Sequence, residues 1–225
     1  ILCNDKLAPY LPSNSLQLGY TDKSCGMISA SNWSSASLIT IPYLYMIAMG
    51  LEGLTESTKM AILHSNYLKN SLKDEYNIID VNENDAVGHE FIIDVTKFKK
   101  LDITENDIAK RLMDYSFHAP TMSWPRTGVL MFEPTESESI DELERLITAM
   151  KSIRREIQEI EDGIYEKDNN VIKNAPHNFK MTQDWSYPYS VSKAFYPVEC
   201  LKDNKFNIPV GRIDDIYGDR LLLKK

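Results

Sequence analysis

Cysteine is scarce in this sequence, and the patterns by which cysteines hold a protein together are missing. The 225 residues contain three cysteines, Cys3, Cys25 and Cys200. Because their number is odd and their positions are scattered, we expect neither a disulfide framework nor a C-x-x-C zinc motif. A reducing intracellular compartment is therefore predicted. A chain of this length can bury a sizeable core without a disulfide or a metal.

Long runs of one charge are also missing. The chain has 25 Lys and Arg against 33 Asp and Glu, a formal net charge of −8, and neither sign forms a block. Non-specific binding of nucleic acid depends on a dense basic surface, so we expect no nucleic-acid partner. The patterns G-x-G-x-x-G and G-x-x-x-x-G-K-[ST] do not occur, which removes the usual glycine cradles for nucleotide phosphates.

The histidines form no recognisable metal motif. His89 and Glu90 begin an H-E pattern, but the second histidine that a helical zinc site requires does not follow four residues later. The other histidines are His64, His118 and His177, and they are far apart in the sequence. We therefore expect no bound metal, and we expect most histidines to have structural roles.

A leader peptide and a membrane span are not expected either. The first residues, ILCNDKLAPYLP, have no basic region before an apolar core. The longest apolar stretch, residues 38–51, is shorter than a span and is interrupted by Pro42. This pattern favours a buried helix and no membrane partner.

The first half of the sequence predicts loops, then helices, then strands. Residues 1–35 are rich in Ser, Asn and Pro, as if the chain began within a domain. Helices are expected over 35–51 and from an N-cap at Thr55 to about Tyr76. Two β-rich runs within 77–95, separated by the polar turn NEND, predict adjacent strands with antiparallel pairing.

The second half predicts two capped helices around one strand. Thr104 and Asp107 fit a capping box for a helix whose polar face carries Lys110, Arg111 and Asp114. VLMF at 129–132 reads as a strand. A long helix should follow from a capping box of Ser139 and Glu142 to a stop at Gly163. Its predicted buried stripe consists of Ile140, Leu143, Leu146, Ile147, Met150, Ile153, Ile157 and Ile160.

Residues 164–225 contain four prolines and many aromatic residues but no sustained period. We expect an extended tail that wraps over other structure. The order of elements predicts the fold class α/β, with a small α+β domain near 78–163 preceded by helices that belong to a further domain.

Three groups of polar residues could form a site. The serine-rich loop at 28–37 could hold an anion where it enters a helix, or Ser34 or Ser35 could simply cap that helix. Glu133, Glu136 and Glu138 could be paired acids, but acidic residues before a helix are also favoured electrostatically. Arg212 could bind a substrate carboxylate or could pin the tail through ion pairs with nearby aspartates.

Six sequence motifs together indicate the family that the chain resembles. LEGLTESTKMAILHSNYLKNSL, GHEFIID, KRLMDYSFHAPTMSWP, EPTESES, NNVIKNAPH and GRIDDIYGDR occur in this order. Together they resemble the C-terminal region of glycine dehydrogenase (decarboxylating), the P-protein of the glycine cleavage system. The resemblance implies the C-terminal part of a fold-type I pyridoxal-phosphate enzyme. Residues 1–76 would end its large domain, 77–163 would form the small domain, and 164–225 would be the wrapping tail.

The same resemblance implies a function. Members of the family release carbon dioxide from glycine and transfer the aminomethyl group to the lipoyl arm of H-protein, using pyridoxal phosphate. By the resemblance Ser29, Ser34 and Ser35 would face the cofactor, while His118 and Thr121 would form a wall of the active site. The family's Schiff-base lysine lies in a segment that these residues do not contain. We therefore expect this chain to be inactive without the remainder of the P-protein.

The resemblance also implies a homodimer, and a location in a bacterial cytoplasm or a mitochondrial matrix. Some positions depart from the family pattern: Asn32 and Ser34 replace a proline and a glycine of the serine loop, and Arg126 and Thr127 replace a Val-Pro pair. A second hypothesis therefore stays open. The chain could be a non-catalytic remnant or scaffold that binds a full-length P-protein or H-protein.

Overall fold

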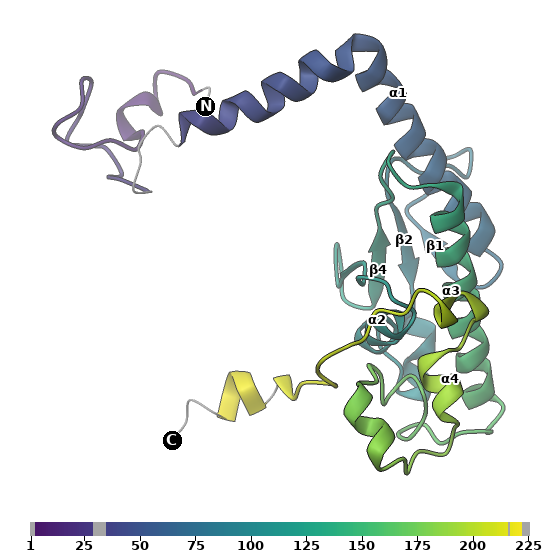
Figure 1. Cartoon of the computed structure of the whole chain (residues 1–225). Coiled ribbons are helices and arrows are strands. Elements are labelled where there is room, and N and C mark those ends of the chain that lie inside the picture. Colours follow the sequence, from purple (N-terminus) through teal and green to yellow (C-terminus); the bar gives the residue numbers. More distant parts are fainter. Residues whose placement is uncertain (1–2, 29–34, 216, 222–225) are drawn as a thin grey trace. The chain divides into compact units, whose positions relative to one another are not determined.

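The structure is a computed structural model that describes residues 3–28, 35–215 and 217–221. It divides into two units, residues 1–56 and 57–225, here called the N-terminal and the C-terminal unit. Figure 1 labels the helices and strands. The division at residues 76 and 163 stays a prediction.

The N-terminal unit consists of loops, short 3-10 turns and the first part of a long helix. The turns are η1 (Ala8–Tyr10) and η2 (Ala36–Ile39), as expected for a stretch with so many turn residues. Helix α1 spans Thr40–Leu72 and has a non-helical residue at Gly50, with φ 61°. The break therefore lies at Gly50, where a left-handed φ costs glycine little. The predicted N-cap at Thr55 is wrong, because its hydroxyl lies inside the helix and donates to Leu51 O at 2.8 Å.

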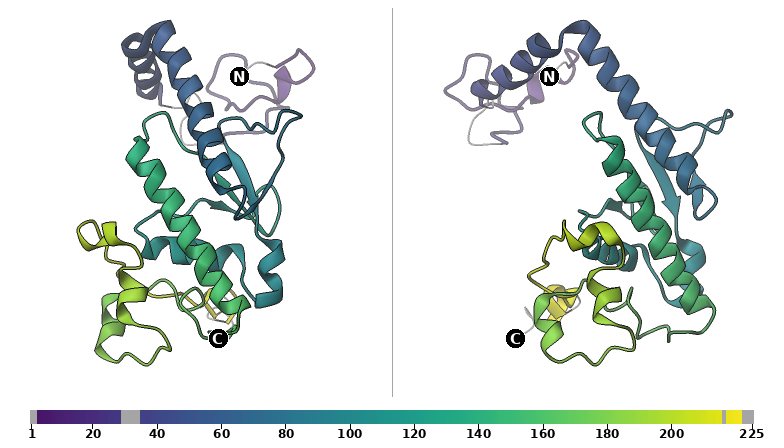
Figure 2. Two further views of the ribbon diagram at one scale, coloured as in Figure 1. Left: turned by 90° about the vertical axis from the view of Figure 1, so that its right-hand side faces the viewer. Right: turned by 45° about the vertical axis from the view of Figure 1, so that its right-hand side comes forward.

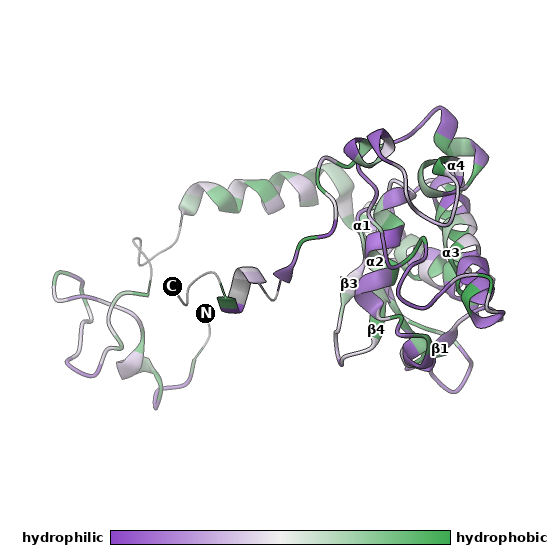
Figure 3. Cartoon of the chain, turned by 90° about the horizontal axis from the view of Figure 1, so that it is seen from below, coloured by the Kyte–Doolittle hydropathy of each residue, from purple (hydrophilic) through white to green (hydrophobic). Residues whose placement is uncertain are grey.

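Pro42 does not interrupt the apolar stretch, because it occupies the first turn of α1, where a missing N–H is harmless. Among the described residues, the helical segment 36–72 is long and apolar enough to cross a membrane by length and composition alone. The apolar residues of its first part are exposed: Ile41 by 64%, Ile47 by 61% and Leu51 by 84%. Figure 3 shows this hydrophobic colouring along the helix.

The C-terminal unit is built on a four-stranded antiparallel sheet with strand order β1-β2-β4-β3. The strands are β1 (Asn77–Ile79), β2 (Phe91–Asp94), β3 (Thr121–Met122) and β4 (Val129–Phe132). In the central pair Ile93 lies opposite Leu130, and both side chains are fully buried. The predicted antiparallel pairing and the strand at 129–132 are confirmed, whereas the two-residue β3 was not expected.

Two capped helices complete the layer over the sheet. In α2 (Glu105–Asp114) Thr104 and Asp107 form the predicted capping box. Helix α3 (Ile140–Glu161) starts at Ser139, whose hydroxyl accepts from Glu142 N at 3.2 Å. Glu142 does not complete a capping box, because its carboxylate binds Arg145 instead.

Helix α3 ends as the sequence predicts. Gly163 has φ 74° and donates to Ile160 O at 3.1 Å, while Ile164 N donates to Glu159 O at 2.9 Å. These two bonds are the Schellman pattern. Most of the predicted stripe is buried, but Ile140 is 59% exposed. The C-terminal part of α1 lies beside α3 (Figure 2), and Tyr76 Oη donates to Met150 O at 2.8 Å.

Arg111 and Asp114 are not on a solvent-exposed face of α2, as the sequence had suggested, but are fully buried. Arg111 forms two bonds to the Glu156 carboxylate, at 3.0 and 2.7 Å, and one to Asp114 at 2.9 Å. It also donates to the carbonyls of Lys193 and Ala194, both at 2.8 Å. Burial opposes the positive charge, but Glu156 and the other acidic neighbours outweigh it and raise the pKa of Arg111.

The tail packs on the unit and supplies part of its core. Val171, Ile172, Phe195 and Leu201 are buried and belong to the main hydrophobic cluster. The remaining helical elements of the C-terminal unit are η3 (Thr96–Leu101), η4 (Phe179–Gln183), α4 (Val191–Phe195), η5 (Glu199–Lys202) and the π-helix η6 (Tyr217–Leu221). The sequence does not indicate helix α4, because five residues are too few to show a hydrophobic period.

We expect Arg111→Met to lower the free energy of unfolding by about 3–5 kcal/mol, because two carboxylates would stay buried without their partner. Urea denaturation measures the change. Lys202→Met is the control, since Lys202 pairs with Glu199 in water, where an ion pair contributes little. Equal stability of the two variants would contradict the role given to Arg111.

Gly128 offers a second test, because it precedes β4 with φ 91° and a Cβ there would collide with the methyl group of Thr96. Gly128→Ala should lower the free energy of unfolding by about 1–3 kcal/mol. Gly88→Ala is the control, because a Cβ at Gly88 meets no atom within 4 Å and the residue has no left-handed φ. The same denaturation experiment compares the two alanine variants.

Candidate functional site

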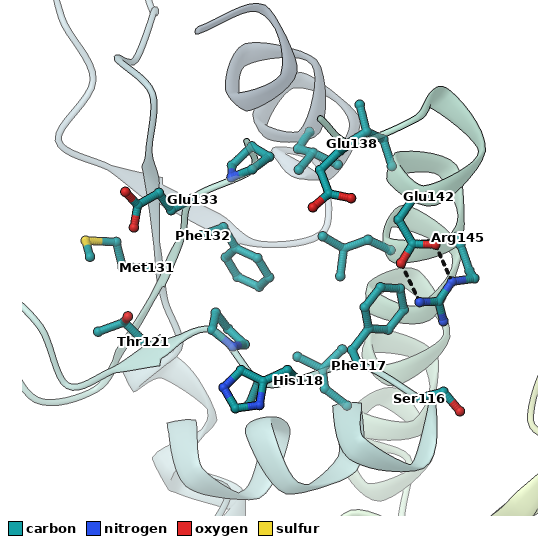
Figure 4. A pocket seen from close by; sticks show the side chains of 17 residues that line it. Ser116, Phe117, His118, Thr121, Met131, Phe132, Glu133, Glu138, Glu142 and Arg145 are labelled. Atoms are coloured by element: carbon teal, nitrogen blue, oxygen red, sulfur yellow. Dashed lines mark hydrogen bonds and ion pairs between the residues drawn. The ribbon is translucent and has the colours of Figure 1, made fainter. Parts of the chain in front are cut away.

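A cavity of about 520 Å³ opens in the C-terminal unit. Figure 4 shows that its lining comes from the link after α2, the end of β4 and the first turns of α3. The apolar part of the lining includes Leu68, Leu112, Phe117, Phe132, Leu143 and Leu146. The polar part includes His118, Thr121, Glu133, Glu138, Glu142 and Arg145. A mostly apolar wall with a few converging polar groups is typical of a small-molecule site.

The link after α2 brings His118 and Thr121 to this cavity. Helix α2 ends at Asp114, and Ser116 has φ 63°, which turns the chain out of the helix. Phe117 N donates to Leu112 O at 3.1 Å and closes that turn. Thr121 then pairs with Met131 in the β3–β4 ladder. The side chains of His118 and Thr121 are exposed, so both can reach a ligand.

The α3 side of the cavity carries an ion pair. Arg145 donates to both oxygens of Glu142, at 2.8 and 2.5 Å, and to Tyr115 O at 3.0 Å. Its guanidinium lies 3.6 Å from the centre of the Phe117 ring. The hydrogen bonds from Arg145 lower the pKa of Glu142 below its usual value. Glu142 is therefore held as a carboxylate at neutral pH.

Two of the three glutamates that the sequence assigns to the start of the helix, Glu133 and Glu138, also line the cavity. The sequence did not indicate this, because their placement depends on β4 and α3 packing on the link after α2. With Glu142 they give the cavity three carboxylates, against one guanidinium that is already paired. Such a wall suits a ligand that presents a cationic or hydrogen-bond-donating group.

Pyridoxal phosphate does not fit this cavity alone. No lysine lines the cavity, so the described residues around it offer no amine for a Schiff base. The single guanidinium is bound by Glu142, and the carboxylates would repel a phosphate. The cavity can supply hydrogen bonds from His118 and Thr121, apolar contacts and negative charge.

The serine loop is only partly described. Ser29 and Ser34 lie outside the described residues. Ser35 occupies the N-cap position of η2, but its side chain makes no capping bond. Its hydroxyl instead lies 3.0 Å from the hydroxyl of Ser37. Capping by the Ser35 side chain is therefore not observed, and contact between these serines and a cofactor stays a prediction.

Arg212 holds the tail by binding an aspartate of α2. Its Nη1 donates to Asp107 at 2.6 Å, and its Nε donates to Ala175 O at 2.9 Å. Arg212 does not line the cavity that contains His118. The ion pair by which Arg212 pins the tail is thus made with Asp107. A role of Arg212 in binding a substrate carboxylate stays a prediction.

Two further histidines have structural partners. His177 is buried, with Nδ1 2.7 Å from Asp114 Oδ2 and Nε2 2.8 Å from the hydroxyl of Tyr189. His64 Nδ1 lies 2.9 Å from Thr135 O. The prediction of structural roles is confirmed for both residues.

The fold and its cavity define the C-terminal unit as a small α/β domain with an antiparallel sheet. Residues 57–177 match the family model described as glycine dehydrogenase, C-terminal domain. The chain therefore belongs to the glycine dehydrogenase family, as the resemblance in its motifs predicted.

Curated relatives match nearly the whole chain. It is 45% identical over 227 residues, 99% of its length, to a mitochondrial glycine dehydrogenase (decarboxylating) of Dictyostelium discoideum. Bacterial proteins of the same name are similar: that of Bordetella avium is 45% identical over 96% of the chain, and that of Bacteroides fragilis 46% over 97%. The chain spans 23% of the length of each relative.

The lowered pKa of Asp107 predicts how the stability of the fold changes with pH. Burial by itself would raise its pKa, but hydrogen bonds from Thr104 and Arg212 outweigh burial and lower the pKa below the usual 3.8. A lowered carboxyl pKa stabilises the fold above the pKa of the unfolded chain, and this contribution is lost as the pH falls through the folded-state value. Asp107→Asn should therefore be less stable than the parent chain at pH 6, and the difference should shrink towards pH 3.

Urea denaturation across this pH range measures the difference. Asp74→Asn, at an exposed position, is the matched control and should follow the parent chain at every pH. A stability difference for Asp107→Asn that is the same at pH 6 and pH 3 would argue against a hydrogen-bonded Asp107 carboxylate.

Proposed function

We propose that this chain is the C-terminal portion of a glycine decarboxylase that depends on pyridoxal phosphate. The assembled protein releases carbon dioxide from glycine and transfers the aminomethyl group to the lipoyl arm of H-protein. The observation that carries this proposal is the similarity of 45–46% over almost the whole chain to proteins named glycine dehydrogenase (decarboxylating). The cavity with His118 and Thr121 supports it.

In this proposal the cavity is one wall of the active site. His118 and Thr121 contact the bound substrate, because both are exposed on the same rim. The imidazole can donate or accept a hydrogen bond, and the hydroxyl can orient a small polar group beside it. The apolar wall around Phe132 and Leu146 keeps water from the bound substrate.

In this proposal the cofactor is attached to a lysine outside these 225 residues, because the family segment that carries that lysine is not among them. The remainder of the P-protein, in the same or a separate chain, is therefore a required partner. The exposed apolar part of α1 supports this, because a helix that is apolar all round is stable only when it is covered. We propose that the remainder of the protein covers it and that the assembled enzyme is a homodimer.

The compartment follows from the same assignment. One relative is named mitochondrial and the others come from bacteria, which supports a location in a mitochondrial matrix or a bacterial cytoplasm.

The second candidate function is a non-catalytic scaffold that binds a full-length P-protein or H-protein. The departures of the serine loop from the family pattern favour it, since Asn32 and Ser34 stand where the family has a proline and a glycine. Both hypotheses expect this chain to be inactive by itself. They differ in whether the assembled protein uses its residues in the reaction.

The test is exchange of the glycine carboxylate with carbon dioxide in the presence of lipoylated H-protein. The chain alone should show no exchange and no pyridoxal absorbance. The chain assembled with the remainder of the P-protein should show both. Exchange by the chain alone would overturn the claim that the lysine lies elsewhere, and an assembled protein without exchange would leave the scaffold as the function.

Within the active assembly, His118→Gln and Thr121→Val should each lower kcat by about 10- to 100-fold, as expected for a lost hydrogen bond to the reacting substrate. Thr127→Val is the matched control, because Thr127 is also exposed but lies in the turn before β4 and not in the cavity lining. If all three variants keep the parent kcat, the cavity is not part of the active site.

A further inference from the structure

The chain positions three potential metal ligands at one end of the β2–β4 ladder. Phe91 lies opposite Phe132 in the antiparallel register, so the next pair outward is Glu90 and Glu133. His89 precedes Glu90 and reaches the same end. One ligand atom from each of His89, Glu90 and Glu133 lies within 4.8 Å of the other two.

The three atoms are close enough to share an ion. His89 Nε2 lies 3.7 Å from Glu133 Oε1 and 3.9 Å from Glu90 Oε2. Zinc binds nitrogen and carboxylate oxygen at about 2.0–2.2 Å, so neighbouring ligands of a tetrahedral site are about 3.4 Å apart. The side chains are 40–61% exposed, and a small rotation would bring them to that spacing.

The electrostatics of this end of the ladder favour a cation. Like charges directly opposite each other on neighbouring strands are destabilising. Among the described residues, the His89 ring is the only basic group within ion-pair distance of Glu90 or Glu133. A bound dication would neutralise both carboxylates and accept the lone pair of the imidazole.

The segment that carries two of the ligands is held in place by α1. Asn66 exchanges two hydrogen bonds with the backbone of Val87, at 2.8 and 3.0 Å. Lys69, which is 1% exposed, binds the Asp85 carboxylate at 2.6 Å. Because these anchors lie a few residues before His89, the ligands start from a defined position and little ordering is needed on binding.

We propose that His89, Glu90 and Glu133 bind a divalent transition metal, with Zn²⁺ as the ion that best suits this ligand set. Water completes the coordination on the exposed side. Glu133 also lines the cavity that contains His118. The ion would therefore link the residues before β2 to the residue after β4, at the rim of that cavity. This site is independent of the proposed function, because it uses neither the cofactor nor the substrate.

The H-E pair was visible in the sequence, but its third ligand was not. Glu133 follows His89 by 44 positions, and only the antiparallel pairing of β2 and β4 brings the two together. The spacing rule for a helical zinc site therefore does not apply to this arrangement.

The experiment is calorimetric titration of ZnCl₂ into the full 225-residue chain after removal of metal with a chelator. Because Cys3, Cys25 and Cys200 are exposed and could bind zinc, all three are replaced by serine in every protein compared. The expected result is one saturable site per chain. Its Kd should rise at least about tenfold in His89→Ala and in Glu133→Gln.

Glu83→Gln is the matched control, since Glu83 is an exposed glutamate in the loop before the site. It should leave the Kd unchanged. Circular dichroism of each variant confirms that the fold is kept, and thermal unfolding with and without ZnCl₂ gives an independent readout. The proposal is overturned if no saturable binding occurs, or if the His89 and Glu133 variants bind zinc as tightly as Glu83→Gln does.

Discussion

The buried guanidinium of Arg111 is the interaction on which the rest of the C-terminal unit depends. Its five N–H groups are rarely satisfied by one helix, and here the partners come from α2, α3 and the tail. A buried charge is tolerated only when it is paired and fully hydrogen-bonded. Arg111 therefore specifies where α3 and the tail must lie relative to α2.

The same network positions the candidate site. Asp114, the partner of Arg111, ends α2 and accepts from His177 N at 2.7 Å, which attaches the tail to the end of the helix. Lys205 then donates to Asp114 O, and Phe206 N donates to the Ser116 hydroxyl at 2.8 Å. Burial lowers the pKa of Lys205 to about 8. The tail thus supports the link that carries His118 and Thr121 to the cavity.

Features that depend on neighbouring residues were predictable from the sequence. The cap at Thr104, the stop at Gly163 and the strand at 129–132 are local, and each has a direct physical signal. The motifs also predicted the family and the cavity residues His118 and Thr121, although their contact with a substrate is untested. Hydrophobic periodicity alone indicates neither the family nor these residues.

Features that depend on distant partners were not predictable. Arg111 looks like a surface residue of an amphipathic helix, because the Glu156 carboxylate and the carbonyls of Lys193 and Ala194 that bury it lie 45 to 83 positions away. The sequence predicts a helix start at Thr55, because a threonine before an apolar run resembles a cap, whereas in the structure the non-helical residue of α1 is Gly50. Short elements such as β3 and α4 leave no period to detect.

The contacts of the tail also determine where the chain can be truncated without losing part of the fold. The family-model match ends at residue 177, yet Arg111 donates to the carbonyls of residues 193 and 194, and Asp107 accepts from Arg212. A protein truncated at residue 177 would leave Arg111 short of two acceptors and would lack Phe195 and Leu201 of the hydrophobic core. The structural unit therefore extends at least 35 residues beyond the end of the family-model match, to Arg212.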